Sequence, residues 1–163
     1  MGSRSQIEKE IDLAYVAGFL DGDGSLMLQI KKRSDGKIGL RFMPTICFYQ
    51  DTRHESPLFW IREVFGIGYL SRRNDGMSEL RINGYKRVAL ILEELFPYIR
   101  FKKIQSQALL SACRILSSTK FLNLSKKELE TLVDLILSIQ NENYVTKKKK
   151  TKKEILIQLD LTP

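Results

Sequence analysis

The sequence predicts an α+β fold in which helices pack on one antiparallel sheet of four strands. Two stretches alternate between apolar and polar residues, and each is interrupted by a short turn, as expected of β-hairpins. Segments with the apolar spacing of amphipathic helices precede, separate and follow these hairpins. The predicted order is therefore helix, two strands, helix, two strands and helix (αββαββα), followed by carboxy-terminal helices.

The first helix is predicted over Glu8–Phe19, with Gly24 as its stop. The first hairpin then begins at Ser25 and turns at residues 34–37, which read Ser-Asp-Gly-Lys. Pro44 in its second strand has no N–H group and predicts a sheet edge or a bulge. Alternation assigns one apolar face to Leu26, Leu28, Ile30, Leu40, Phe42, Ile46 and Phe48, and the opposite face to Met27, Gln29, Lys31, Arg33, Arg41, Met43, Thr45, Cys47 and Tyr49.

The second half of the predicted unit starts with a short helix. Ser56 as N-cap and Pro57 at the first helical position indicate its start, and Gly66 its end. The second hairpin turns at Asn-Asp-Gly, residues 74–76. Its arms are Gly68–Arg73 and Ser78–Ile82, and its polar side carries Ser71, Arg73, Glu79 and Arg81. Three further helices are predicted over Tyr85–Leu95, Lys102–Leu116 and Ser125–Gln140, the last with a capping box formed by Ser125 and Glu128.

Length and composition indicate one soluble, intracellular domain, predicted over residues 1–145. No apolar run is long enough to span a membrane, and no signal peptide opens the chain, so no membrane partner is expected. The two cysteines have no metal-binding spacing. The net charge of +8 suits a phosphate-rich partner. Between residues 25 and 82, where the strands are predicted, ten basic residues stand against six acidic ones.

Residues 146–163 are predicted to form a basic tail. Six lysines lie between residues 147 and 153, so they supply most of the net charge. Such a run is most often a solvated segment, but it could also add phosphate contacts, and nuclear targeting is the least supported interpretation. Ile155, Leu156, Ile157 and Leu159 could dock back on the domain. The sequence leaves these alternatives open.

A ridge of small residues follows one side of the first helix. Ala14, Gly18 and Gly22 recur every four residues, and Ala17 broadens the ridge. Two such helices could approach almost backbone to backbone. Asp23 follows the ridge directly, so it would lie close to the same residue of a second copy. Two carboxylates in such proximity repel each other unless a cation lies between them, and a divalent metal such as Mg²⁺ fits this requirement.

Residues 14–25, Ala-Tyr-Val-Ala-Gly-Phe-Leu-Asp-Gly-Asp-Gly-Ser, resemble the motif of the LAGLIDADG homing endonucleases. The resemblance extends over most of the chain, because the following hairpins and helices match the order of the family. A single motif resembles the homodimeric branch, in which the sheets form a saddle for double-stranded DNA. The resemblance implies metal-dependent double-strand cleavage with Mg²⁺, for which Mn²⁺ can substitute. It assigns metal binding to Asp23, with the Gly22 carbonyl beside it, and no principal role to Asp21.

The resemblance also implies three further catalytic positions. Gln50 matches a glutamine that orders water near the scissile phosphate, and Lys102 matches a basic residue that supports the same water network. His54 occupies a position where single-motif relatives often have arginine. Either His54 or the neighbouring Arg53 could therefore fill the third position.

The polar face of the predicted sheet would read the major groove. Its predicted DNA-binding residues are Met27, Gln29, Lys31, Arg33, Arg41, Met43, Thr45, Cys47, Ser71, Arg73, Glu79 and Arg81. Two-fold symmetry then requires a nearly palindromic target. Two alternatives remain, an intron RNA-binding maturase and a DNA-binding regulator that has lost cleavage. Retention of both Asp21 and Asp23 weakens the second. The sequence is compatible with an organelle, chloroplast or mitochondrion, and with the prokaryotic cytoplasm.

Overall fold

A computed structural model describes residues 5–33, 39–144 and 147–161. The predicted α+β class is confirmed. The elements are α1 (Gln6–Asp23), β1 (Gly24–Lys32), β2 (Leu40–Asp51), a 3₁₀ turn η1 (Thr52–His54), α2 (Ser56–Phe65), β3 (Tyr69–Arg72), β4 (Met77–Asn83), α3 (Tyr85–Leu95), α4 (Lys103–Ser118), a 3₁₀ turn η2 (Phe121–Asn123), α5 (Lys126–Glu142) and α6 (Lys152–Gln158). The turn predicted at residues 34–37 lies outside the described residues.

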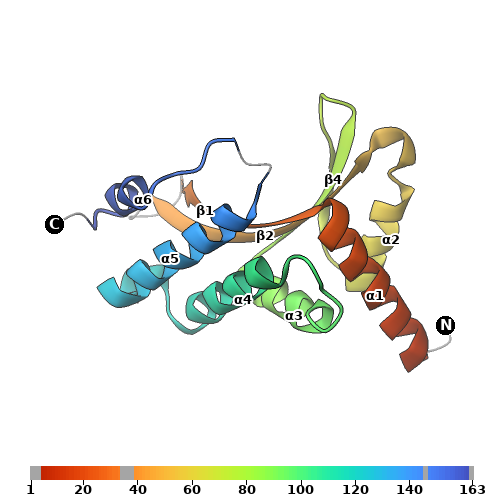
Figure 1. Ribbon diagram of the computed structural model, residues 1–163, viewed down its shortest axis with the longest axis horizontal. Helices are drawn as coiled ribbons and strands as arrows, with labels where there is room; N and C mark the ends of the chain where they lie inside the picture. The colour runs from red at the N-terminus through yellow and green to blue at the C-terminus, as the bar shows by residue number, and fades with distance from the viewer. Residues whose placement is uncertain (1–4, 34–38, 145–146, 162–163) are drawn as a thin grey trace.

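The four strands form one antiparallel sheet in the order β1-β2-β4-β3. Its apolar face packs against the helices, and the core includes Leu26, Phe48, Leu80 and Ile82. In Figure 1, α3, α4 and α5 lie beneath the sheet, whereas no described helix lies above its middle. The opposite face is therefore open and is flanked by the β3–β4 hairpin at one end and the segment before α6 at the other.

Helix α1 is longer than predicted, because it continues past Phe19 to Asp23. A capping box of Ser5 and Glu8 begins it. Gly24 ends it in an extended conformation, with φ −95°. A Cβ at Gly24 would lie 2.9 Å from the Leu20 Cα, so glycine is needed for close backbone approach and not for a left-handed turn. As a result, Asp23 is the last helical residue and β1 starts directly after it.

The start of α2 differs from the prediction. Glu55, and not Ser56, is the N-cap residue, and no side chain caps the helix. The Glu55 carboxylate instead accepts hydrogen bonds from Arg72 and from the Ser78 hydroxyl, which tie α2 to the β3–β4 hairpin. The predicted end at Gly66 is confirmed, with φ 65°.

Pro44 was predicted to lie at a sheet edge or a bulge, and β2 has a local edge at this residue. It pairs with Leu28 of β1, whereas the ladder between β2 and β4 begins at Thr45. This part of β2 has a strand on one side only, which suits a residue without an N–H group.

The basic segment does not continue as a free tail. Thr151 and Glu154 form a capping box that starts α6, and Ile155 is 1% exposed in the core. The predicted boundary at 145/146 falls on residues outside the described ranges, but α6 packs against α5. Of the four apolar residues that could dock back, Ile155, Leu156 and Leu159 pack against the core, whereas Ile157 is 54% exposed. Within the described ranges, the apolar length needed to cross a membrane is not reached by any helix.

Candidate active site and DNA interface

The two aspartates at the end of α1 have different environments. Asp21 is 8% exposed, and its carboxylate accepts hydrogen bonds from three consecutive backbone N–H groups, those of Arg100, Phe101 and Lys102, at 2.6, 3.1 and 3.0 Å. These groups precede α4, which has no side-chain cap of its own. Asp21 therefore caps the start of α4 from another helix, which is a structural role.

We expect Asp21→Ala to destabilise the fold by about 2–4 kcal/mol, because three backbone N–H groups at the start of α4 lose a charged, buried acceptor. The midpoint of equilibrium unfolding in urea measures this loss. Asp23→Ala is the matched control, since Asp23 is exposed and no hydrogen bond fixes its side chain among the described residues. Equal midpoints for the two variants would show that the Asp21 cap contributes little.

Asp23 opens into a cavity of about 480 Å³ at the junction of α1, β1 and the start of α4. Five of the predicted site residues line this cavity together: Gly22, Asp23, Met27, Arg73 and Lys102. Sequence reasoning missed other lining residues, among them Ser25, Tyr49, Asp75, Gln105 and Glu142. For Tyr49 the signal was present, because it follows Cys47 in the alternation of β2.

Lys102 is held at this cavity by the same contacts that place Asp21. Its Nζ donates a hydrogen bond to the Asp21 carbonyl oxygen at 2.6 Å. Burial lowers the pKa of its ammonium group, and the carboxylates of Asp21 and Asp23 oppose that shift. The arrangement places a cation beside Asp23, where it can interact with an anionic phosphate.

Gln50 and His54 do not line the cavity in this single protomer. The first residue of β1, Gly24, pairs with Phe48 of β2. Gln50 follows Phe48 by two residues and so extends beyond the end of this pairing. Its Oε1 accepts a hydrogen bond from the Asp51 N–H at 2.8 Å. His54 is exposed at the end of η1. The neighbouring Arg53 donates to both carboxylate oxygens of Asp51, at 3.0 and 2.8 Å, and keeps the Asp51 pKa well below its usual value.

The predicted dimer seam is exposed along α1, with one correction. Ala14, Gly18 and Gly22 are exposed, whereas Ala17 is 0% exposed and packs in the core of its own protomer. A Cβ added at Gly18 or Gly22 would meet no atom within 4 Å. Packing inside the protomer therefore does not explain why these two residues are glycines. Ile7 and Ile11 extend the stripe and are 70% and 62% exposed.

The strand register places the predicted DNA-binding side chains on one face of the sheet. Cross-strand pairs join Lys31 with Arg41, Gln29 with Met43, and Cys47 with Arg81. Three of the twelve are nevertheless buried: Thr45 and Cys47 are 0% exposed and Glu79 is 8% exposed. Thr45 and Cys47 are short side chains on the inner strand β2, between β1 and β4. The DNA-binding role of these three residues stays a prediction, although their burial in the protomer disfavours direct contacts with bases.

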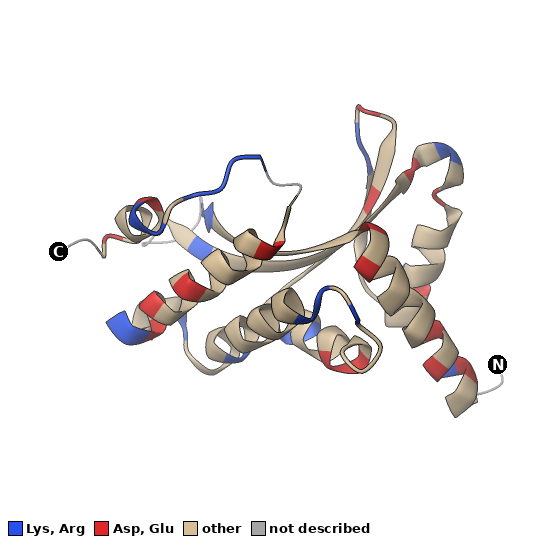
Figure 2. Cartoon of the chain, in the orientation of Figure 1, with Lys and Arg blue, Asp and Glu red and all other residues tan. Residues whose placement is uncertain are grey.

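The lysine segment lies on the open side of the molecule, as Figure 2 shows. The backbone N–H of Lys150 donates to Gln140 at 3.0 Å, and Lys149 Nζ donates to the Asn141 carbonyl at 3.3 Å. Lys148 and Lys150 line a hollow of about 330 Å³ together with Met27, Gln29 and Lys31 of β1. The segment thus continues the basic face of the sheet.

Comparison with known protein families identifies the family of this chain. The family model described as LAGLIDADG endonuclease matches residues 16–116, which include the last part of α1, the whole sheet and most of α4. The chain belongs to the LAGLIDADG endonuclease family. It is therefore a DNA endonuclease of the homing type, and the two alternatives, maturase and inactive regulator, are not favoured.

Two relatives support this assignment. The LAGLIDADG chain is 32% identical over 111 residues to DNA endonuclease I-CvuI of Chlorella vulgaris, covering 68% of this chain and 69% of the relative. It is 30% identical over 129 residues to DNA endonuclease I-CreI of Chlamydomonas reinhardtii, covering 79% and 78%. A crystal structure of I-CvuI with its target and calcium superposes with a TM-score of 0.82 at 25% identity, covering 97% of this chain and all of the relative. A second I-CvuI complex was obtained with magnesium, so divalent metals accompany DNA complexes in this family.

Proposed function

We propose that two copies of the chain pack through the α1 seam and together make a double-strand break in a long, nearly palindromic DNA duplex. The observation that carries this proposal is the end of α1. Two glycines without a packing reason inside the protomer precede an exposed carboxylate that opens into the cavity with Lys102. Close helix packing across the seam would bring the two Asp23 residues together beneath the DNA.

The residues at this end of α1 fit a divalent metal of the Mg²⁺ type, with Mn²⁺ able to replace it. Asp23 is exposed and offers its carboxylate, and the neighbouring exposed Gly22 offers its carbonyl oxygen. Carboxylate and carbonyl oxygens are the hard ligands that Mg²⁺ prefers. When bound, the metal would stabilise charge on the attacking and leaving oxygens of the phosphodiester. Within the described residues of one protomer, no three His, Cys, Asp or Glu residues gather into a metal site.

The remaining roles belong to side chains of the chain itself. Lys102 would hold its ammonium group near the scissile phosphate and stabilise the developing negative charge. Gln50 would orient a water molecule from the end of β2. For the third position we propose His54, because the Arg53 guanidinium is already engaged by both oxygens of Asp51.

Target recognition would come from the open face of the sheet. Exposed or half-exposed side chains on this face can donate to guanine or pair with adenine in the major groove: Gln29, Lys31, Arg33, Arg41, Ser71, Arg73 and Arg81. Met27 and Met43, both half-buried, offer apolar contacts to thymine methyl groups. The proposed substrate is intracellular DNA, in an organelle (chloroplast or mitochondrion) or in the prokaryotic cytoplasm.

The test of this function is a selection of cleaved sites from a random duplex library. With Mg²⁺ we expect linear products that share one long, nearly palindromic sequence, and with Ca²⁺ we expect binding without cutting. Binding without cutting in both metals would overturn the enzymatic proposal. Preference for structured RNA over duplex DNA at equal salt would favour the maturase.

We expect the lysine segment to add phosphate contacts that do not depend on sequence. The double variant Lys148→Ala with Lys150→Ala removes two lysines from each copy of the proposed dimer. It should reduce the slope of log affinity against log salt by about 3.6, since each of the four phosphate contacts contributes about 0.9. Fluorescence anisotropy at several salt concentrations measures this slope. The double variant Lys126→Ala with Lys127→Ala, at the start of α5, removes the same charge outside the open face. Equal slopes for both variants would contradict the assignment.

A further inference from the structure

Glu79 lies in the centre of the proposed reading face but is not positioned as a base contact. In the sheet register it pairs with Tyr49 on β2 and with Ser71 on β3. Its side chain is 11% exposed, whereas those of Arg73 and Arg81 are 46% and 32% exposed. A groove-facing carboxylate must be accessible to accept a hydrogen bond from cytosine. The Glu79 carboxylate is therefore less accessible than either arginine.

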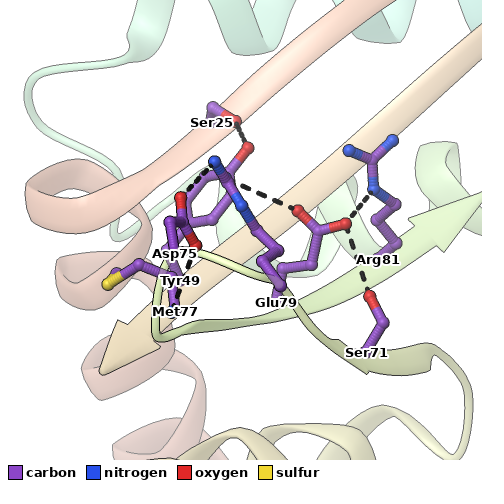
Figure 3. Close-up of polar contacts among 8 residues, drawn as sticks. Ser25, Tyr49, Ser71, Asp75, Met77, Glu79 and Arg81 are labelled. Carbon is purple, nitrogen blue, oxygen red and sulfur yellow. Dashed lines mark hydrogen bonds and ion pairs between the residues drawn. The ribbon is translucent and has the colours of Figure 1, made fainter. Parts of the chain in front are cut away.

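Both carboxylate oxygens of Glu79 are engaged inside the protein, as Figure 3 shows. Oε1 accepts a hydrogen bond from Arg81 Nε at 2.8 Å and another from the Ser71 hydroxyl at 3.4 Å. Oε2 lies 4.0 Å from Arg73 Nη1. Each oxygen therefore faces a different arginine, and one carboxylate links side chains that come from β4 and from the end of β3.

The contacts leave the terminal nitrogens of Arg81 available, whereas both terminal nitrogens of Arg73 face carboxylates. Glu79 bonds Arg81 through Nε, so the two terminal nitrogens of Arg81 are not used by this bond. In Figure 3 they point away from Glu79. The hydrogen bond to Glu79 also raises the pKa of Arg81. Arg73 is held on its other side by Asp75, at 2.7 Å.

Long side chains lose rotamer freedom when they bind, and this loss is reduced when they are fixed beforehand. Resting on the proposed DNA-reading function, we infer that Glu79 is a positioning residue that fixes Arg73 and Arg81 as one reading unit. Two base positions in each half-site then depend on a side chain that touches neither base.

The experiment compares cleavage-site profiles from a random duplex library for the full-length protein. Arg73→Gln and Arg81→Gln first identify the position that each arginine reads. Glu79→Gln should then relax the preference at both of these positions, by about 2- to 12-fold at each. In the double variant with Arg81→Gln, Glu79→Gln should add no further loss at the Arg81 position.

Glu79→Asp provides an independent variant, because it keeps the charge but shortens the side chain, and it should relax the same two positions. Glu63→Gln, an exposed glutamate on α2, is the matched control and should leave the profile unchanged. A Glu79→Gln effect at a single position that neither arginine reads would make Glu79 a direct base contact and overturn the inference. An unchanged profile would also overturn it. If the two arginine variants themselves left the profile unchanged, the proposed reading face would fail, and the inference with it.

Discussion

Asp23→Asn should lower the rate of DNA cleavage by about 10³-fold or more, while DNA affinity stays near its original value. The change removes the negative charge that holds the metal but keeps the size of the side chain. The Asp23 side chain makes no hydrogen bond to another described residue, so the fold should not change. Single-turnover cleavage in Mg²⁺ and binding in Ca²⁺ measure the two quantities separately.

The matched control for this variant is Asp134→Asn on α5. It removes a carboxylate that pairs with Lys152 and does not line the cavity of Asp23. It should cleave at the original rate. Undiminished cutting by Asp23→Asn would remove Asp23 from the active site, and an equal loss in both variants would indicate a general effect of charge.

Gly18→Leu should convert the protein to a monomer in solution and thereby abolish double-strand cleavage. The protomer has space for the new side chain, because nothing lies within 4 Å of a Cβ at this position. In the dimer both copies bring the leucine to the same seam, and each overpacked side chain costs about 1–3 kcal/mol. Self-association should therefore weaken by roughly 10²- to 10⁴-fold.

Sedimentation velocity over a range of concentrations measures this change, and circular dichroism verifies that the helices are retained. Ser117→Leu, on the exposed side of α4, adds the same kind of side chain away from the seam and should leave association unchanged. A Gly18→Leu protein that stayed fully dimeric would contradict packing through α1.

The fold could be predicted because its signals are local. Alternation along β1 and β2 assigned side chains to the two faces of the sheet, and the register confirms that assignment. The turn at residues 74–76 and the capping box of Ser125 and Glu128 could also be predicted, because each depends on residues that are close together in the sequence.

The features that could not be predicted from the sequence depend on contacts between segments that are far apart in the chain. Asp21 and Asp23 share the same local motif, but only Asp21 meets the N–H groups of residues about 80 positions later, and this separates the two roles. Alternation also predicts a face and not an exposure, so Thr45 and Cys47 were placed on the correct face although both are buried. The lysine run concealed α6, whose N-cap residue Thr151 lies within the run and whose first two residues are lysines.

The central claim is that two identical carboxylates from two copies share one metal-binding centre beneath the DNA. A crystal structure of the protein with its target and Mn²⁺, with anomalous scattering collected for manganese, tests this most directly. We expect anomalous density at the two-fold axis, with Asp23 oxygens of both copies within about 2.0–2.3 Å of manganese. Manganese bound elsewhere, or Asp23 residues of the two copies remote from each other, would contradict it.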